Sequence, residues 1–286
     1  MSVLQENTTG AQASRDFAEK RSSSRLVSRM PGLNDLLSGK VGLVVGVSNE
    51  RSIAAGCAQA FRDAGAELVL TCREKSKPFV EPVAKSIEPR LLLPLDVETE
   101  GSLESVFDQI RSTFGRLDFA LHSITFCQKQ DFHGRVTDCS REGFARAMDV
   151  CVHSFIRMAR LAEPLMAGGG CLLTVSYYGA EKVVDHYNIM GPVKSALQGT
   201  VRYLAAELGP QGIRVNAVSP GPLKTRAGSG IDHFDELIDD ARARAPERRL
   251  VSLEDVGAMA AGLVSDFARN VTGSICYVDA GYHVMA

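Results

Sequence analysis

The stretch VGLVVGVSNERSIAAGCAQAFRDAG, residues 41–65, decides the fold. Its first part, Val41 to Gly46, is a short apolar run that predicts a strand buried on both faces. The remainder predicts a helix, because apolar side chains recur on one face and Ser52 suits an N-cap. A buried strand that leads through a short turn into a helix is the repeating unit of a parallel α/β sheet.

The turn in this unit is a candidate phosphate site. Backbone N–H groups and the positive end of a helix dipole can hold a pyrophosphate there, and a small residue lets it approach. Gly46 and Ser52 are the candidates. The Gly-x-Gly-x-x-Gly pattern is absent, so ordinary helix capping is the alternative.

Six further apolar segments alternate with helical patterns along the chain. This order predicts an α/β fold: a doubly wound, mostly parallel, Rossmann-like sheet of about seven strands with helices on both faces. Ligands of such sheets bind beyond the carboxyl ends of the strands, where Asp96 is either a binding residue or a plain strand-end cap. The six segments are Glu67 to Thr71, Leu91 to Val97, Asp118 to Ser123, Cys171 to Ser176, Ile213 to Ser219 and Ser274 to Asp279.

A tyrosine and a lysine seven positions apart, Tyr187 and Lys194, open the amphipathic segment HYNIMGPVKSALQGTVRYLAAEL, residues 186–208. On a helix this spacing returns both side chains to nearly one face. The phenol can donate a hydrogen bond to a carbonyl oxygen that gains negative charge, and the ammonium can lower the phenol's pKa or hold a cofactor hydroxyl. A core tyrosine beside a solvent-exposed lysine is the alternative.

From about Gly39 onward, the residues resemble the short-chain dehydrogenase/reductases, and within them the divergent branch of enoyl-acyl carrier protein reductases. Conventional members carry Tyr-x-x-x-Lys, whereas this branch carries Tyr-x6-Lys with a second tyrosine ten residues earlier, the position of Tyr177. Further motifs that look like this branch are Gly46-x5-Ser52-Ile53-Ala54, His122-Ser123-Ile124, Tyr187-Asn188-x-Met190-Gly191, Arg214-Val215-Asn216-Ala217 and Gly221-Pro222-x-x-Thr225.

The resemblance implies reduction of the trans-2 double bond of enoyl-acyl carrier protein thioesters in fatty-acid biosynthesis, with NADH or NADPH as cofactor. Tyr187 would hydrogen-bond the thioester oxygen, Lys194 would bind the nicotinamide ribose, and Tyr177 would shape the pocket or merely pack. The implied cofactor-binding residues are Gly46, Ser52, Ile53, Arg73, Asp96, Val97, Ser123, Ile124, Lys194, Leu223 and Thr225. The implied substrate-binding residues are Tyr177, Met190, Ala227, Ile231 and Phe234.

Two other functions stay open at this point. Tyr178 and Lys182 also satisfy Tyr-x-x-x-Lys, which would indicate a carbonyl reductase, but no long helical pattern carries Lys182. Thr125, where the family has a smaller residue, could narrow the nicotinamide pocket and leave a catalytically weak nucleotide-binding homologue. Arg73 leaves NADPH open because arginine can pair with a 2′-phosphate, although the adjacent Glu74 argues for NADH.

Composition sets the remaining expectations. Residues 1–38 are Ser/Arg-rich and predict a disordered N-terminal extension, with a transit peptide as the alternative; residues 39–286 predict one reductase domain with a substrate-binding loop near 224–245. A net charge of −2 and no long apolar run argue against nucleic-acid and membrane binding. Seven scattered cysteines indicate a reducing, cytoplasmic setting, and the histidines predict no metal site.

The expected partners follow from the resemblance, which implies a homotetramer and a substrate bound to acyl carrier protein. Lys224 lies beside the predicted substrate-binding loop and is a candidate contact for that acidic carrier. A solvated charged surface is the alternative. Further members of this possible basic rim are Arg226, Arg242, Arg244, Arg248 and Arg249.

Overall fold

The computed structural model describes residues 35–225 and 228–285. Seven parallel strands form one sheet in the order β3-β2-β1-β4-β5-β6-β7, which confirms the predicted doubly wound α/β fold. The strand order changes direction between β1 and β4: β2 and β3 lie on one side of β1, and β4 to β7 lie on the other. Sheets of this kind bind ligands at this point. The strands are β1 (Val41–Val45), β2 (Glu67–Cys72), β3 (Leu91–Pro94), β4 (Phe119–His122), β5 (Gly170–Val175), β6 (Ile213–Pro220) and β7 (Ile275–Val278).

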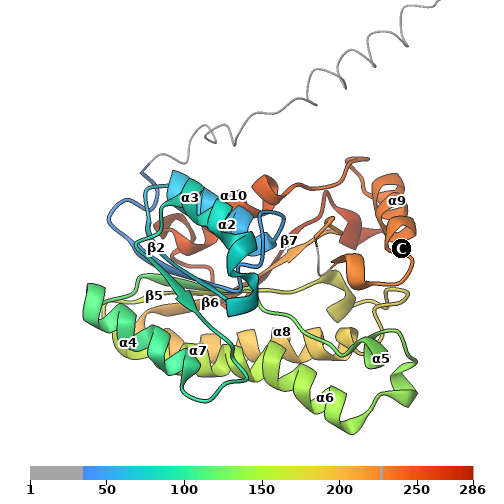
Figure 1. Ribbon diagram of the computed structural model, residues 1–286. Coiled ribbons are helices and arrows are strands. Elements are labelled where there is room, and N and C mark those ends of the chain that lie inside the picture. Colours follow the sequence, from blue (N-terminus) through green and yellow to red (C-terminus); the bar gives the residue numbers. More distant parts are fainter. Residues whose placement is uncertain (1–34, 226–227, 286) are drawn as a thin grey trace, which may run out of the picture. The chain divides into compact units, whose positions relative to one another are not determined.

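Helices cover both faces of the sheet (Figure 1). One face carries α2 (Ile53–Asp63), α3 (Lys77–Ile87) and α10 (Leu253–Val264), and the other carries α4 (Ser102–Phe114), α7 (Ser154–Ala162) and α8 (Met190–Leu208). The remaining helices are α5 (Lys129–Phe132), α6 (Arg141–Met148), the π-helix Asp149–His153 and α9 (Phe234–Arg244).

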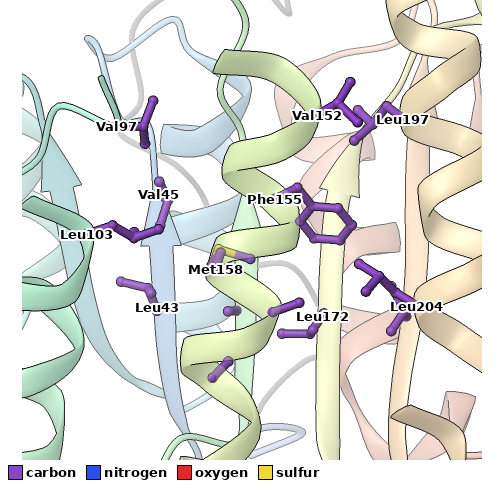
Figure 2. Close-up of a cluster of buried hydrophobic side chains, with 14 of the residues drawn as sticks. Leu43, Val45, Val97, Leu103, Val152, Phe155, Met158, Leu172, Leu197 and Leu204 are labelled. Carbon is purple, nitrogen blue, oxygen red and sulfur yellow. The ribbon is translucent and has the colours of Figure 1, made fainter. Parts of the chain in front are cut away.

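The larger hydrophobic core lies between the sheet and the α4, α7 and α8 layer. Figure 2 shows Phe155 of α7 between Leu172 of β5 and Leu197 of α8, and Met158 of α7 on the side of β1. All four side chains are fully buried, and each such burial stabilises the fold by about 1.5–3 kcal/mol. The apolar stripe of α8 therefore orients this helix, with Lys194 on it, against the sheet.

The first strand-turn-helix unit forms as its sequence predicts. Ser52 has an extended backbone, and its hydroxyl accepts a hydrogen bond from the Ala55 N–H at 3.2 Å, which caps α2. The helix ends at Asp63, with Ala64 as its C-cap and Gly65 at φ +95°. The capping that was the alternative explanation for Ser52 is thus present, whatever else this residue does.

Two predicted boundaries differ from the structure by more than one residue. Strand β3 ends at Pro94 and not at Val97: Pro94 has no N–H for the ladder, and the Asp96 N–H donates to the Ser102 hydroxyl (3.2 Å). At the N-terminal side, residues 35–38 were assigned to the extension but form a turn in which Leu37 is fully buried and donates its N–H to the Ala64 carbonyl. The rest of the predicted extension, residues 1–34, lies outside the described residues.

Candidate active site

A cavity of about 780 Å³ lies at the carboxyl ends of the strands. Its walls bring together residues that are more than 180 positions apart in the chain, as Gly46 and Phe234 show. Of the site residues predicted from the sequence, Ala227 lies outside the described residues. The others all line this cavity: Gly46, Ser52, Ile53, Arg73, Asp96, Val97, Ser123, Ile124, Tyr177, Tyr187, Met190, Lys194, Leu223, Thr225, Ile231 and Phe234.

The turn after β1 has the shape that a phosphate site needs. Gly46 adopts φ +99°, and a Cβ built on it would stand 2.3 Å from the Ser123 carbonyl oxygen, so only glycine fits. The N-terminus of α2 faces the same cavity, where Ser52 and Ile53 line the wall. The N–H groups and the dipole at a helix N-terminus suit the pyrophosphate of a dinucleotide.

Tyr187 does not lie on the helix that carries Lys194. Helix α8 begins at Met190, so the argument from helical spacing is wrong, although both side chains line the cavity. The backbone reverses here through His186 and Asn188, which adopt φ +62° and +46°. Histidine and asparagine are among the residues that tolerate this left-handed conformation best. The local turn, and not a helix, therefore aims the phenol.

The electrostatics of this pair also differ from the expectation. Burial, together with the neighbouring Tyr177, raises the pKa of Tyr187 well above its usual value, and this rise outweighs any lowering by the Lys194 ammonium. Burial lowers the pKa of Lys194, whose Nζ donates to the Val175 carbonyl at 2.8 Å. An ammonium has three donor protons, and this bond uses one. Of the two predicted roles for Lys194, binding a cofactor hydroxyl is the one that fits.

Tyr177 follows β5, and its ring packs edge to face on that of Tyr187, with centroids 4.8 Å apart. Burial raises the pKa of Tyr177 as well. Within residues 35–225 and 228–285, its hydroxyl is one of two buried side-chain polar atoms that have no hydrogen-bond partner. Such an atom costs about 1–3 kcal/mol, which fits a donor that pairs with a ligand oxygen in the cavity.

The competing pair Tyr178 and Lys182 is placed elsewhere. Tyr178 begins a short 3₁₀ turn and packs its ring on Tyr282, with centroids 5.7 Å apart. Lys182 is exposed, and neither residue is in the cavity wall. The geometry therefore favours Tyr187 over Tyr178 as the tyrosine that meets a ligand.

One end of the cavity carries charge. The Arg73 guanidinium lies 2.6 Å from the Asp96 carboxylate and 3.6 Å from that of Glu98. Partial burial opposes ionisation of Asp96, but the hydrogen bonds from Arg73 prevail and lower its pKa. Asp96 is therefore more than a strand-end cap, because it engages the arginine that the sequence left open for a 2′-phosphate.

The other end is apolar and includes residues that the sequence analysis missed. Met190, Ile231 and Phe234 line it as predicted, and Phe126, Cys127, Phe132 and Val150 join them. The segment TFCQKQDF, residues 125–132, held the signal, but its aromatic residues follow neither a helical nor a strand period. Thr125, the residue suspected of narrowing the pocket, is exposed and belongs to the cavity wall.

His122 lies buried beneath the site and was also missed as a candidate. Its ring nitrogens hydrogen-bond the hydroxyls of Ser154 at 2.8 Å and Thr174 at 3.2 Å. Burial, with the nearby Lys194 ammonium, lowers the pKa of His122 to about 3. The imidazole is therefore neutral at physiological pH and serves as a spacer between α7 and β5.

Most of the possible basic rim is paired with carboxylates, whereas Arg248 donates to the Ala243 carbonyl. Lys224 lies 3.5 Å from Asp235, Arg242 lies 3.1 Å from Asp239, and Arg249 lies 3.0 Å from Asp255. Arg226 is outside the described residues. In the part of the chain that the structure describes, no helix has the length and apolar character to cross a bilayer. The same part holds no cluster of three or more His, Cys, Asp or Glu arranged to bind a metal ion.

Comparisons with known proteins point in one direction. The family model described as enoyl-(acyl carrier protein) reductase matches residues 46–283. The chain is 45% identical over 257 residues to enoyl-acyl-carrier-protein reductase (NADH) 1 of Rhizobium meliloti strain 1021, covering 90% of this chain and 94% of that protein. It is 44% identical over 252 residues to the corresponding NADH enzyme FabI of Aquifex aeolicus strain VF5, covering 87% and 93%.

Solved structures agree with these sequences. The enoyl-acyl-carrier-protein reductase of Anaplasma phagocytophilum in complex with NAD superimposes with a TM-score of 0.85 at 44% identity, covering 88% of this chain and 97% of that one. The Bacillus cereus enzyme with NADP⁺ and an indole naphthyridinone gives a TM-score of 0.86 at 40% identity, covering 88% and 99%.

Proposed function

Because the chain belongs to the enoyl-(acyl carrier protein) reductase family, we propose that it reduces the trans-2 double bond of enoyl thioesters carried by acyl carrier protein, with NADH as cofactor. One observation carries the proposal: Tyr187, Lys194 and the glycine turn after β1 line one cavity. The relatives of R. meliloti and A. aeolicus bear the same activity in their names.

The cavity offers groups for each part of a dinucleotide and leaves its apolar end for the substrate. Gly46 and the N-terminus of α2 would hold the pyrophosphate, and Lys194 would donate to a ribose hydroxyl. The carboxylate of Asp96 suits the adenosine end, where it can accept hydrogen bonds. The reduced nicotinamide, when bound, supplies the hydride for the β-carbon of the substrate.

Tyr187 would do the chemical work of the chain itself. Its phenol stays protonated because burial raises its pKa, so it can donate a hydrogen bond to the thioester oxygen. That bond strengthens as negative charge develops on the oxygen, and a donor of this kind is worth about 10²–10³ in kcat. The unpaired Tyr177 hydroxyl is a second donor for the same substrate group.

The preference for NADH follows from the charge at the adenosine end. Arg73 is already neutralised by Asp96 and Glu98, and these two carboxylates would repel the 2′-phosphate of NADPH. The names of the relatives in R. meliloti and A. aeolicus also specify NADH, whereas the B. cereus structure contains NADP⁺. The balance at Arg73 favours the first group.

Setting and assembly belong to the same proposal. Its elements are a cytoplasmic homotetramer and an acyl carrier protein as the bearer of substrate. The seven cysteines support a reducing compartment, since all are free thiols. Size-exclusion chromatography with light scattering would test the tetramer.

The function is tested by following NADH absorbance with a trans-2-enoyl thioester, beside Tyr187→Phe and a ketone control. We expect enoyl-dependent oxidation that the substitution weakens by about 10²–10³. Oxidation with the ketone alone would favour a carbonyl reductase, and binding of NADH without oxidation would favour an inactive homologue.

A further inference from the structure

The two neighbours of Tyr187 in the chain each contact a different segment near the cavity. The imidazole of His186 stacks on that of His233, with centroids 4.7 Å apart and planes at 25°. On the other side, the Asn188 amide donates to the Phe132 carbonyl at 2.7 Å. His233 lies just before α9, and Phe132 is the last residue of α5, so Tyr187 is anchored to both segments.

A third contact joins these two segments directly. His133 Nδ1 lies 2.6 Å from the Asp232 carboxylate, and the two residues immediately follow Phe132 and precede His233 in the chain. The contacts therefore close on themselves. We call these three contacts the Tyr187 contact network: His186 with His233, Asp232 with His133, and Phe132 with Asn188.

The Tyr187 contact network surrounds apolar groups of the site. Ile231 and Phe234 flank its loop residues in sequence and line the cavity. Asp232 instead pairs with His133, and His233 stacks on His186 and pairs with Glu236 at 2.8 Å. Phe132 lines the cavity too, and its ring lies 6.5 Å from that of Tyr187. Polar contacts outside thus hold apolar contacts inside.

Residues of the Tyr187 contact network have strained backbone conformations. His186, Asn188 and His233 all adopt left-handed conformations, at φ +62°, +46° and +55°. Non-glycine residues in this region persist where surrounding contacts determine them, and they cluster at ligand clamps. Each of these three residues makes one of the contacts of the network.

We propose that the Tyr187 contact network positions the loop 230–236 over the acyl chain, with Asp232 and His133 as positioning residues for the substrate. This inference rests on the proposed function, because the acyl chain is the group that Ile231 and Phe234 would contact. At 2.6 Å the Asp232 carboxylate is close enough to Nδ1 of His133 to pair with it, as an ion pair when the imidazole is protonated. Loosening the loop weakens apolar contacts that substrate and transition state share, which raises KM and spares kcat.

The test compares Asp232→Ala with Asp232→Asn, whose side-chain oxygen can still accept from His133. The matched control is Asp235→Ala, which removes an exposed carboxylate of the same loop that pairs with Lys224. We expect Asp232→Ala to raise KM for a trans-2-dodecenoyl thioester about threefold to tenfold, with less effect on the butenoyl thioester and little on kcat. Asp232→Asn should restore most of the loss, and the control should change neither constant.

Hydrogen exchange of the amides in 230–236 gives a readout that needs no turnover. Faster exchange in Asp232→Ala than in Asp235→Ala would support the proposal that the Tyr187 contact network holds the loop. Equal exchange and equal KM in these two variants would overturn the proposal, as would faster exchange with an unchanged KM. A wild-type protein that oxidises no NADH would contradict the proposed function instead, and the exchange rates would still decide whether Asp232 holds the loop.

Discussion

Gly179 lies against the ring of Tyr187 so closely that no side chain fits between them. A Cβ built on Gly179 would stand 2.6 Å from Tyr187 Cδ1 and 3.0 Å from Cε1. Gly179 belongs to the short turn that follows β5, which carries Tyr177 at its start. The turn after β5 thereby fixes the face of the phenol, and the Tyr187 contact network fixes the backbone on either side of it.

We expect Gly179→Ala to displace Tyr187 and to lower kcat at least tenfold, because an error of about 1 Å at a reacting group costs on the order of 10²-fold. Steady-state kinetics with NADH and an enoyl thioester measure this. Gly199→Ala is the control, since no heavy atom lies within 4 Å of its Cβ and alanine favours helix α8 by up to about 1 kcal/mol. Similar losses in both variants would contradict the argument.

Tyr177→Phe separates a role in packing from a role in catalysis. Removing the unpaired hydroxyl leaves the ring contact with Tyr187 intact, so the free protein should keep its melting temperature or gain slightly. If the hydroxyl donates to substrate, kcat/KM falls about tenfold or more while stability holds. Tyr178→Phe, outside the cavity wall, should change kcat/KM little. Loss of stability without loss of activity would assign Tyr177 to packing.

Glu98→Gln tests the charge argument for NADH. This substitution removes the second carboxylate near Arg73, and we expect the ratio of kcat/KM for NADH to that for NADPH to fall about threefold to tenfold. Glu98 also pairs with Arg146, so Arg146→Gln controls for the loss of that contact. Glu104→Gln, whose carboxylate pairs with Arg157, serves as a remote control. An unchanged ratio would remove Glu98 from the account of cofactor preference.

Acid should destabilise the fold through His122. Its pKa falls from an ordinary 6.5 to about 3 in the folded protein, so between these values the unfolded chain holds the extra proton. The free energy of unfolding therefore decreases as pH falls through this window, by about 1.4 kcal/mol per pH unit from this residue. Urea denaturation between about pH 6.5 and pH 4.5 measures the slope, which His122→Gln should reduce by one proton. Equal slopes would refute the assignment.

Much of the fold follows from local patterns. Seven apolar segments predicted seven strands, and the stripe from Val193 to Leu208 predicted the buried face of α8. Both succeed because burial imposes a period on the side chains. The end of β3 was wrong because Pro94 has no N–H for the ladder and the Asp96 N–H donates to the Ser102 hydroxyl six residues along the chain. A single hydrogen bond of this kind leaves no periodic trace in the sequence.

The sequence by itself determined which chemical groups the site contains: a phenol, an ammonium and a glycine turn, because these residue types and their order along the chain are local facts. The tertiary structure alone decided how they act. It placed Tyr187 before α8 and not on it, raised the pKa of Tyr187 by burial, and joined Arg73 to Asp96. Burial and ion pairing depend on which segments meet in space, and folding brings those segments together from opposite ends of the chain.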